Sequence, residues 1–172
     1  MKFIFLLLFS THVFASNFEV QTAPIAFLAR WYTLDFSYAI TPNWAVGPAY
    51  VSYAANGPYG NMLFPTYSGA AYGVQGRYFF SSISEDSGYV SIHYYNEKYD
   101  SYEEALLGYN ERSGTKAIID IGNRWILWEK VTSQFGIGFE FANQHIVHQP
   151  SGRLDDENRS MLHIEYKIGY LF

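Results

Sequence analysis

The sequence predicts an all-β fold, an eight-stranded antiparallel up-and-down transmembrane β-barrel. Eight segments carry bulky apolar residues at every second position, the period at which the side chains of a strand return to the same face. Aromatic residues make up 20% of the 172 residues, and charged residues only 16%. The last alternating segment runs to the final residue, Phe172. These observations favour a closed sheet that presents aromatic side chains to an apolar solvent.

Strands are expected over residues 18–27, 32–40, 44–50, 72–80, 90–94, 116–127, 135–142 and 162–172. The first segment changes its apolar phase at Pro24, which suggests a bulge. The second is the clearest, with apolar residues at Tyr32, Leu34, Phe36, Tyr38 and Ile40. In the third, Pro48 is an irregularity, because a closed sheet has no free edge for a residue without an N–H group.

The remaining segments follow the same period. The apolar positions of the third to sixth are Trp44, Val46 and Tyr50; Tyr72, Val74, Tyr78 and Phe80; Val90, Ile92 and Tyr94; and Ile119, Ile121, Trp125 and Leu127. Those of the last two are Phe135, Ile137, Phe139 and Phe141, then Leu162, Ile164, Tyr166, Ile168, Tyr170 and Phe172. Gly, Ala, Ser and charged residues occupy most of the opposite positions.

The connections alternate in length. Residues 41–43, 81–87 and 129–133 are short, whereas 56–65, 100–113 and 147–158 are longer and polar. A tight first hairpin near residues 28–30 is the exception. Short turns at one end and long loops at the other are typical of outer-membrane barrels, in which the short turns are periplasmic.

The N-terminal residues have the pattern of a secretory signal peptide. Lys2 supplies the positive charge, residues 3–9 are apolar, and Val13-Phe14-Ala15 is a possible cleavage site. The apolar run is shorter than the roughly 20 residues that a membrane-spanning helix needs. We therefore expect a signal peptide over residues 1–15 and a barrel domain over residues 16–172; a retained anchor or a buried helix is the alternative.

Charge and cysteine content exclude other classes. The formal net charge of −5 disfavours a nucleic-acid partner. The absence of cysteine excludes a disulfide framework. After residue 15 no apolar run is long enough for a transmembrane helix.

Alternation alone also fits a soluble lipocalin-type barrel with an apolar interior. However, an eight-stranded barrel has room only for filling side chains or one small ligand, and the apolar face is too bulky for that space. The apolar face is therefore predicted to point outward, into lipid. An interfacial girdle is predicted near the short turns, made of Trp44, Phe80, Trp125, Phe135, Tyr170 and Phe172.

The same phase directs charged residues into the lumen. They are Asp35, Arg77, Lys116, Asp120, Arg124, Glu140, Glu165 and Lys167. Charges of both signs in a confined space are expected to pair, because an unpaired buried ion is costly. The network is either a polar plug, which we favour, or a gated ion pathway or proton relay.

The C-terminal segment, residues 163–172, resembles the terminal signature of outer-membrane proteins. The resemblance implies that Tyr166, Ile168, Tyr170 and Phe172 act as the signal read by the barrel-assembly machinery. The chain is also similar in plan to small barrels of the OmpA, OmpX and OmpW kind and to uncharacterised outer-membrane β-barrel domain families, with 44–48 and 76–80 as the suggestive stretches. This resemblance implies a Gram-negative outer-membrane location, periplasmic chaperones during insertion, and contact with membrane lipids and lipopolysaccharide. A monomer without cofactor is expected.

Small barrels also include lipid A deacylases and palmitoyltransferases, which use Ser, His and a carboxylate. Ser91, His93 and Glu97 are the comparable residues here, but spacing alone cannot show the hydrogen bond that activation requires, and their phase points them away from lipid. We therefore expect no catalytic residues.

Two groups near the long loops are further candidates. His145 and His148 with Asp155, Asp156 and Glu157 could bind a divalent cation, but a solvated acidic loop is favoured and no metal site is expected. Tyr99, Tyr102 and Tyr109 with Glu103 and Glu104 fit either a protein-contact surface or an interfacial belt.

Three functions remain open: a structural or surface-interaction barrel with exposed loops, which we favour; a narrow passive channel for small or hydrophobic solutes; and a lipid A-modifying enzyme.

Overall fold

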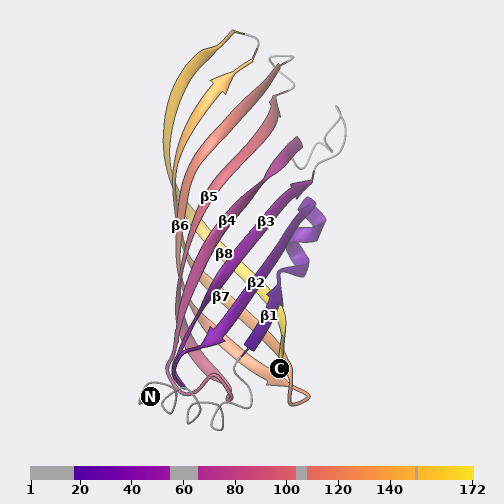
Figure 1. Ribbon diagram of the computed structural model, residues 1–172, viewed down its shortest axis with the longest axis vertical. Coiled ribbons are helices and arrows are strands. Elements are labelled where there is room, and N and C mark those ends of the chain that lie inside the picture. The colour runs from indigo at the N-terminus through magenta and orange to yellow at the C-terminus, as the bar shows by residue number, and fades with distance from the viewer. Residues whose placement is uncertain (1–17, 55–65, 104–107, 150) are drawn as a thin grey trace, which may run out of the picture.

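The computed structural model describes residues 18–54, 66–103, 108–149 and 151–172. Within these residues, eight strands pair in sequence order, each antiparallel to its neighbours, and β1 pairs with β8 to close a barrel (Figure 1). This confirms the predicted eight-stranded up-and-down fold. The expected signal peptide and the connection over 56–65 lie outside the described residues.

The strands differ greatly in length. Their bounds are β1 Phe18–Thr22, β2 Trp31–Ala39, β3 Trp44–Ala54, β4 Thr66–Phe79, β5 Ser87–Glu103, β6 Gly108–Leu127, β7 Val131–His148 and β8 Arg153–Leu171. The strands β5 to β8 therefore rise well above β1 to β3 (Figure 1). We call the opposite end, where the connections over 40–43, 80–86 and 128–130 lie beside the C-terminus, the short-turn end.

The predicted long loops over 100–113 and 147–158 are wrong in extent. Pairing between β5 and β6 continues to Glu103 opposite Gly108, and pairing between β7 and β8 continues to His148 opposite Arg153. In this upper part both faces of the sheet carry polar residues. The apolar alternation that identifies a strand in the sequence therefore disappears, although the backbone pairing does not.

The bulge predicted at Pro24 is also wrong. Strand β1 ends at Thr22, and a 3-10 helix, η1, runs over Pro24–Ala29. Pro24 cannot donate a backbone hydrogen bond to a neighbouring strand, so pairing ends before it. Hydrogen bonds with Thr33 on β2 take over where the backbone pairing of β1 ends. The Thr33 carbonyl accepts from the Thr22 hydroxyl, and the Thr33 hydroxyl accepts from the N–H of Ala23, both at 2.7 Å.

Pro48 is accommodated without a change of register. The pairing of β2 with β3 is interrupted opposite Gly47 and Pro48 and resumes in the same register at Tyr38 and Val46. From inside the barrel, the side-chain amide of Gln75 donates to the carbonyl of Phe36 at 3.2 Å. A side chain thus supplies the donor that Pro48 lacks.

The wall has the predicted two faces. Large apolar residues such as Tyr72, Ile121 and Phe139 are exposed on the outside, whereas alternate residues are buried inside. Among the described residues, no helix has the length and hydropathy needed to cross a membrane.

Small residues leave room for rings within the lumen. The hydroxyl of Tyr89 would lie 2.5 Å from a Cβ atom added at Gly136. The next nearest atoms, Cζ of Tyr89 and the carbonyl oxygen of Ile121, would lie at 3.5 and 3.6 Å, which is ordinary contact. The Tyr89 hydroxyl has no hydrogen-bond partner among the described residues. It is therefore the one group at Gly136 that a methyl side chain would displace.

We expect Gly136→Ala to lower the free energy of unfolding by about 1–3 kcal/mol, the typical cost of overpacking. Adding Tyr89→Phe should recover most of this loss, because it removes the clashing hydroxyl without breaking a described hydrogen bond. Urea unfolding of the single and double variants in detergent micelles measures both effects. A double variant as unstable as Gly136→Ala alone would contradict the packing account.

Candidate functional site in the barrel lumen

At the short-turn end, one buried carboxylate lies between two buried guanidinium groups. The Oε2 atom of Glu19 on β1 is 3.6 Å from a terminal nitrogen of Arg77 on β4 and 3.6 Å from one of Arg124 on β6. The Thr132 hydroxyl donates to Glu19 at 2.5 Å. All three charged side chains are almost fully buried. This cluster crosses the lumen and holds β1, β4, β6 and β7 together.

The turn over residues 80–86 folds into the same end of the barrel. Its Ile83 side chain is buried against Phe79, Tyr89 and two alanines. Arg124 donates to the carbonyls of Ser82, Ile83 and Glu85, and its guanidinium carbon lies 4.3 Å from the centre of the Phe79 ring. The turn and Arg124 together cap the short-turn end.

Two lysines pair with carboxylates higher in the lumen. The ammonium group of Lys167 is 2.8 Å from Asp35 and 2.5 Å from Glu165. That of Lys116 is 3.5 Å from Glu97 and 3.9 Å from Glu140. Lys167 links β8 to β2, which do not pair with each other, whereas Lys116 on β6 contacts carboxylates on its two neighbours, β5 and β7.

The structure places all eight lumen charges predicted from the sequence inside the wall. Seven are buried, and the Lys116 side chain is 12% exposed. The prediction missed Glu19 and did not assign Glu97 to the network. Glu19 has the signal that located the others, because it alternates with Phe18 and Val20, but the expected bulge obscured the phase of β1.

The structure does not assemble the serine, histidine and carboxylate considered in the sequence. The Ser91 hydroxyl donates to Asp120 at 3.4 Å, and His93 Nδ1 faces the Tyr95 hydroxyl at 3.4 Å. Glu97 instead contacts Tyr53, Gln144 and Lys116. Ser91, His93 and Asp120 are neighbours, but the Ser91 hydroxyl donates to the carboxylate and not to the imidazole.

The candidates expected in loops lie on the upper strands. His145 contacts Asp156 at 2.5 Å and His148 contacts Asp155 at 2.8 Å, each across the β7–β8 pairing. The hydrogen bond with His148 lowers the pKa of the exposed Asp155 carboxyl, and Arg153 adds to the effect. Glu157 pairs with Arg112 at 2.9 Å. These carboxylates are therefore paired individually and do not converge on one ion.

The tyrosines expected at a loop surface are separated. Tyr99 lies on β5 inside the barrel, where its ring packs on Tyr53 and Tyr67. Tyr109 is exposed on β6. The side chains of Tyr102 and Glu103, and all of Glu104, lie outside what the structure describes.

The six residues of the predicted girdle all point outward near the short-turn end. Trp44 packs on Tyr78 with ring centres 5.0 Å apart, and Tyr170 packs on Phe172 at 4.9 Å. The N–H of Phe172 donates to the carbonyl of Phe18 at 2.9 Å, so the C-terminal residue takes part in closing the barrel. Tyr166 and Ile168 of the predicted assembly signal share the outward phase.

No protein-family model and no curated protein matches the chain. Among solved structures, it is similar to a major outer membrane protein from Thermus thermophilus, with 11% sequence identity and a TM-score of 0.44. The similarity covers 92% of this chain and 100% of the other.

Proposed function

We propose that the chain is an outer-membrane barrel with a closed lumen that anchors and presents the tall sheet of β5 to β8 outside the membrane. Its partners in this role are membrane lipids and lipopolysaccharide around the wall. The barrel-assembly machinery and periplasmic chaperones would insert it through the C-terminal segment ending at Phe172. The observation that carries the proposal is a lumen filled by paired charges inside a wall with an apolar outer belt.

The height of the apolar belt supports a membrane location. On the outer face of β8, apolar residues run from Leu162 to Phe172, and Ser160 and Asn158 follow above. Ten residue steps of about 3.3 Å along a strand tilted by about 40° span about 25 Å, the height of the apolar band of outer-membrane barrels.

The belt ends at the same level on neighbouring strands. On β6, Ile119 pairs with Ile92 and Phe139, whereas Thr115, further up the same face, pairs with Asn96 and Asn143. The change from apolar to polar neighbours marks the expected outer boundary of the lipid. The parts of β5 to β8 above it would stand in water.

The closed lumen supports a scaffold rather than a passive channel. The Glu19, Arg77 and Arg124 cluster crosses the interior, and the turn over 80–86 covers the short-turn end. A permeating ion would have to separate paired buried charges, which costs several kcal/mol. The lipid A-modifying alternative has less support, because Ser91 donates to Asp120 and not to His93.

We expect the refolded protein to leave a planar lipid bilayer without conductance steps. Replacing residues 82–86 by an Asn-Gly turn should produce steps, because it removes Ile83 and the carbonyls that hold Arg124. Ser84→Ala, a change of an exposed side chain in the same turn, is the matched control and should stay silent.

Steady current through the unaltered protein would instead support the narrow channel. The enzyme alternative has a separate measurement: Ser91→Ala is expected to leave the lipid A profile of expressing cells unchanged.

A further inference from the structure

Among the residues that the structure describes, one buried carboxylate of the lumen has no lysine or arginine partner. Glu19, Asp35, Glu97, Glu140 and Glu165 each lie within 4.0 Å of a lysine or arginine nitrogen. Within the described residues no such contact reaches Asp120, whose neighbours are the Ser91 hydroxyl and His93. Asp120 therefore takes no part in the ion pairs that close the lumen.

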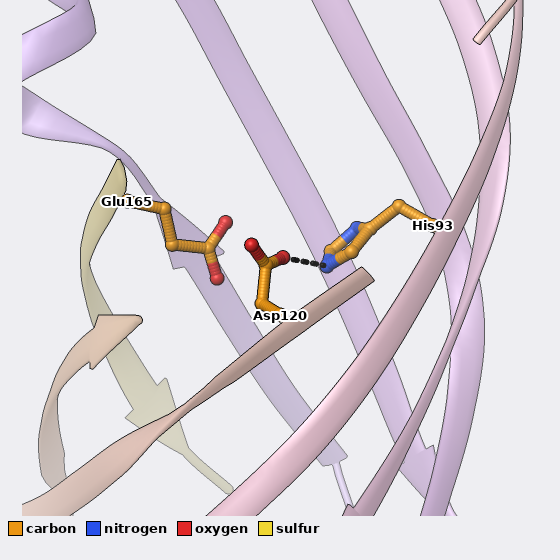
Figure 2. A group of neighbouring side chains, drawn as sticks. All are labelled: His93, Asp120 and Glu165. Carbon is orange, nitrogen blue, oxygen red and sulfur yellow. Dashed lines mark ion pairs between the residues drawn. The ribbon is translucent and has the colours of Figure 1, made fainter. Parts of the chain in front are cut away.

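Three strands bring metal-ligating side chains together around Asp120. His93 comes from β5, Asp120 from β6 and Glu165 from β8, and one ligand atom of each lies within 4.8 Å of the other two. Figure 2 shows the imidazole and the two carboxylates pointing toward one another across the lumen. All three residues are buried.

Unpartnered atoms point into the same space. Neither Nε2 of His93 nor Oδ1 of Asp120 has a hydrogen-bond partner among the described residues, and the distance of 4.0 Å between His93 Nε2 and Asp120 Oδ2 is too long for a hydrogen bond. Both residues are only 1% exposed. Buried polar atoms normally have partners, and an ion held between these two atoms would give each of them one.

The local charge favours a divalent cation. Asp35, Asp120 and Glu165 carry three negative charges, and Lys167, which contacts the first and last of them, carries one positive charge. With His93 neutral, a divalent ion makes this group electrically neutral. Lys167 contacts Oε2 of Glu165, which leaves Oε1 with a hydrogen bond of 3.4 Å from Gln134.

The site lies beside the short β1–β8 pairing, where the 3-10 helix η1 contacts β8. Strand β1 pairs with β8 only from Ile168 to Leu171, so β8 has no strand partner on that edge from Arg153 to Lys167 within the described residues. His163, next to Glu165 at 3.8 Å, has a side chain that is 23% exposed.

We propose that His93, Asp120 and Glu165 bind one divalent transition-metal ion of the zinc type. One imidazole and two carboxylates are ligands that Zn²⁺ and related ions accept, and three protein ligands leave a position for water. The ion links β5, β6 and β8 at the middle of the lumen.

The test is titration of the full chain, refolded in detergent micelles and freed of metal by chelator, with Co²⁺ as a spectroscopic probe. One equivalent of Co²⁺ is expected to bind and give visible absorption bands. His93→Gln and Asp120→Asn should each weaken binding at least tenfold. His145→Gln is the matched control, because His145 also contacts a carboxylate but lies at the exposed rim.

Unchanged binding in both His93→Gln and Asp120→Asn would overturn the proposal, as would loss of binding in His145→Gln or no Co²⁺ band in the unaltered protein. Heat-modifiable migration on a gel shows whether each variant has folded. If His93→Gln does not fold, Asp120→Asn decides, because it keeps the size of the side chain. None of these outcomes depends on whether the lumen conducts.

Discussion

Replacing Glu19 with alanine is expected to lower the free energy of unfolding by about 3–5 kcal/mol, the range for removing one partner of a buried ion pair. The stability is lost because the substitution leaves two buried cations without their carboxylate. Arg77 and Arg124 both lie 3.6 Å from the Glu19 carboxylate, and without it two buried guanidinium groups face each other. The Thr132 hydroxyl also loses its acceptor.

Urea unfolding followed by the fluorescence of the four tryptophans measures this loss. Glu85→Ala, which removes an exposed carboxylate at the same end of the barrel, should change stability by less than about 0.5 kcal/mol. Combining Glu19→Ala with Arg77→Met should cost less than the sum of the single changes, because one unpaired cation is removed. Additive effects would show that the cluster does not couple these strands.

The sequence could predict which way a side chain faces, because that depends only on the period of two along a strand. Arg124 and Trp125 are neighbours in the chain, and their opposite chemistry already indicates that one lies inside and the other in the girdle. The same rule would have found Glu19 had the phase of β1 been read from Phe18 and Val20 alone.

Which side chains meet inside the barrel depends instead on the register between strands. His93 lies opposite Ile118, and Ser91 lies opposite Asp120, so the imidazole reaches Asp120 diagonally. A shift of two residues in the pairing of β5 with β6 would leave every side chain on the same face of the sheet. It would nevertheless separate His93 from Asp120 and so break their cluster with Glu165. Alternation carries no information on such shifts, and for this reason the sequence suggested Glu97 as the carboxylate near His93.

The upper halves of β5 to β8 could not be predicted from the sequence for a different reason. A strand with polar residues on both faces lacks the apolar period, and contacts between strands, such as that of Arg112 on β6 with Glu157 on β8, are visible only once the register is known. The level at which the apolar period stops was nevertheless present in the sequence, between Ile119 and Thr115 on β6.

The second large effect on stability is expected at Ile121, on the apolar side of this boundary. This side chain is 55% exposed in the middle of the apolar belt on β6, with Val90 and Ile137 as its cross-strand neighbours. We expect Ile121→Arg to lower the free energy of unfolding in lipid vesicles by about 2–4 kcal/mol, the cost of an arginine on the lipid face near the bilayer midplane.

Thr115→Arg is the matched substitution, because Thr115 lies on the same strand and the same face between Asn96 and Asn143. Near the interface the cost of arginine falls to about 0–1 kcal/mol, so only the change at Ile121 should be large. In water the two outward-facing positions would differ little, since neither arginine would lose its hydration. Equal, small effects at Ile121 and Thr115 would therefore remove the membrane location, whereas a steep dependence on height would place the lipid boundary between these two residues.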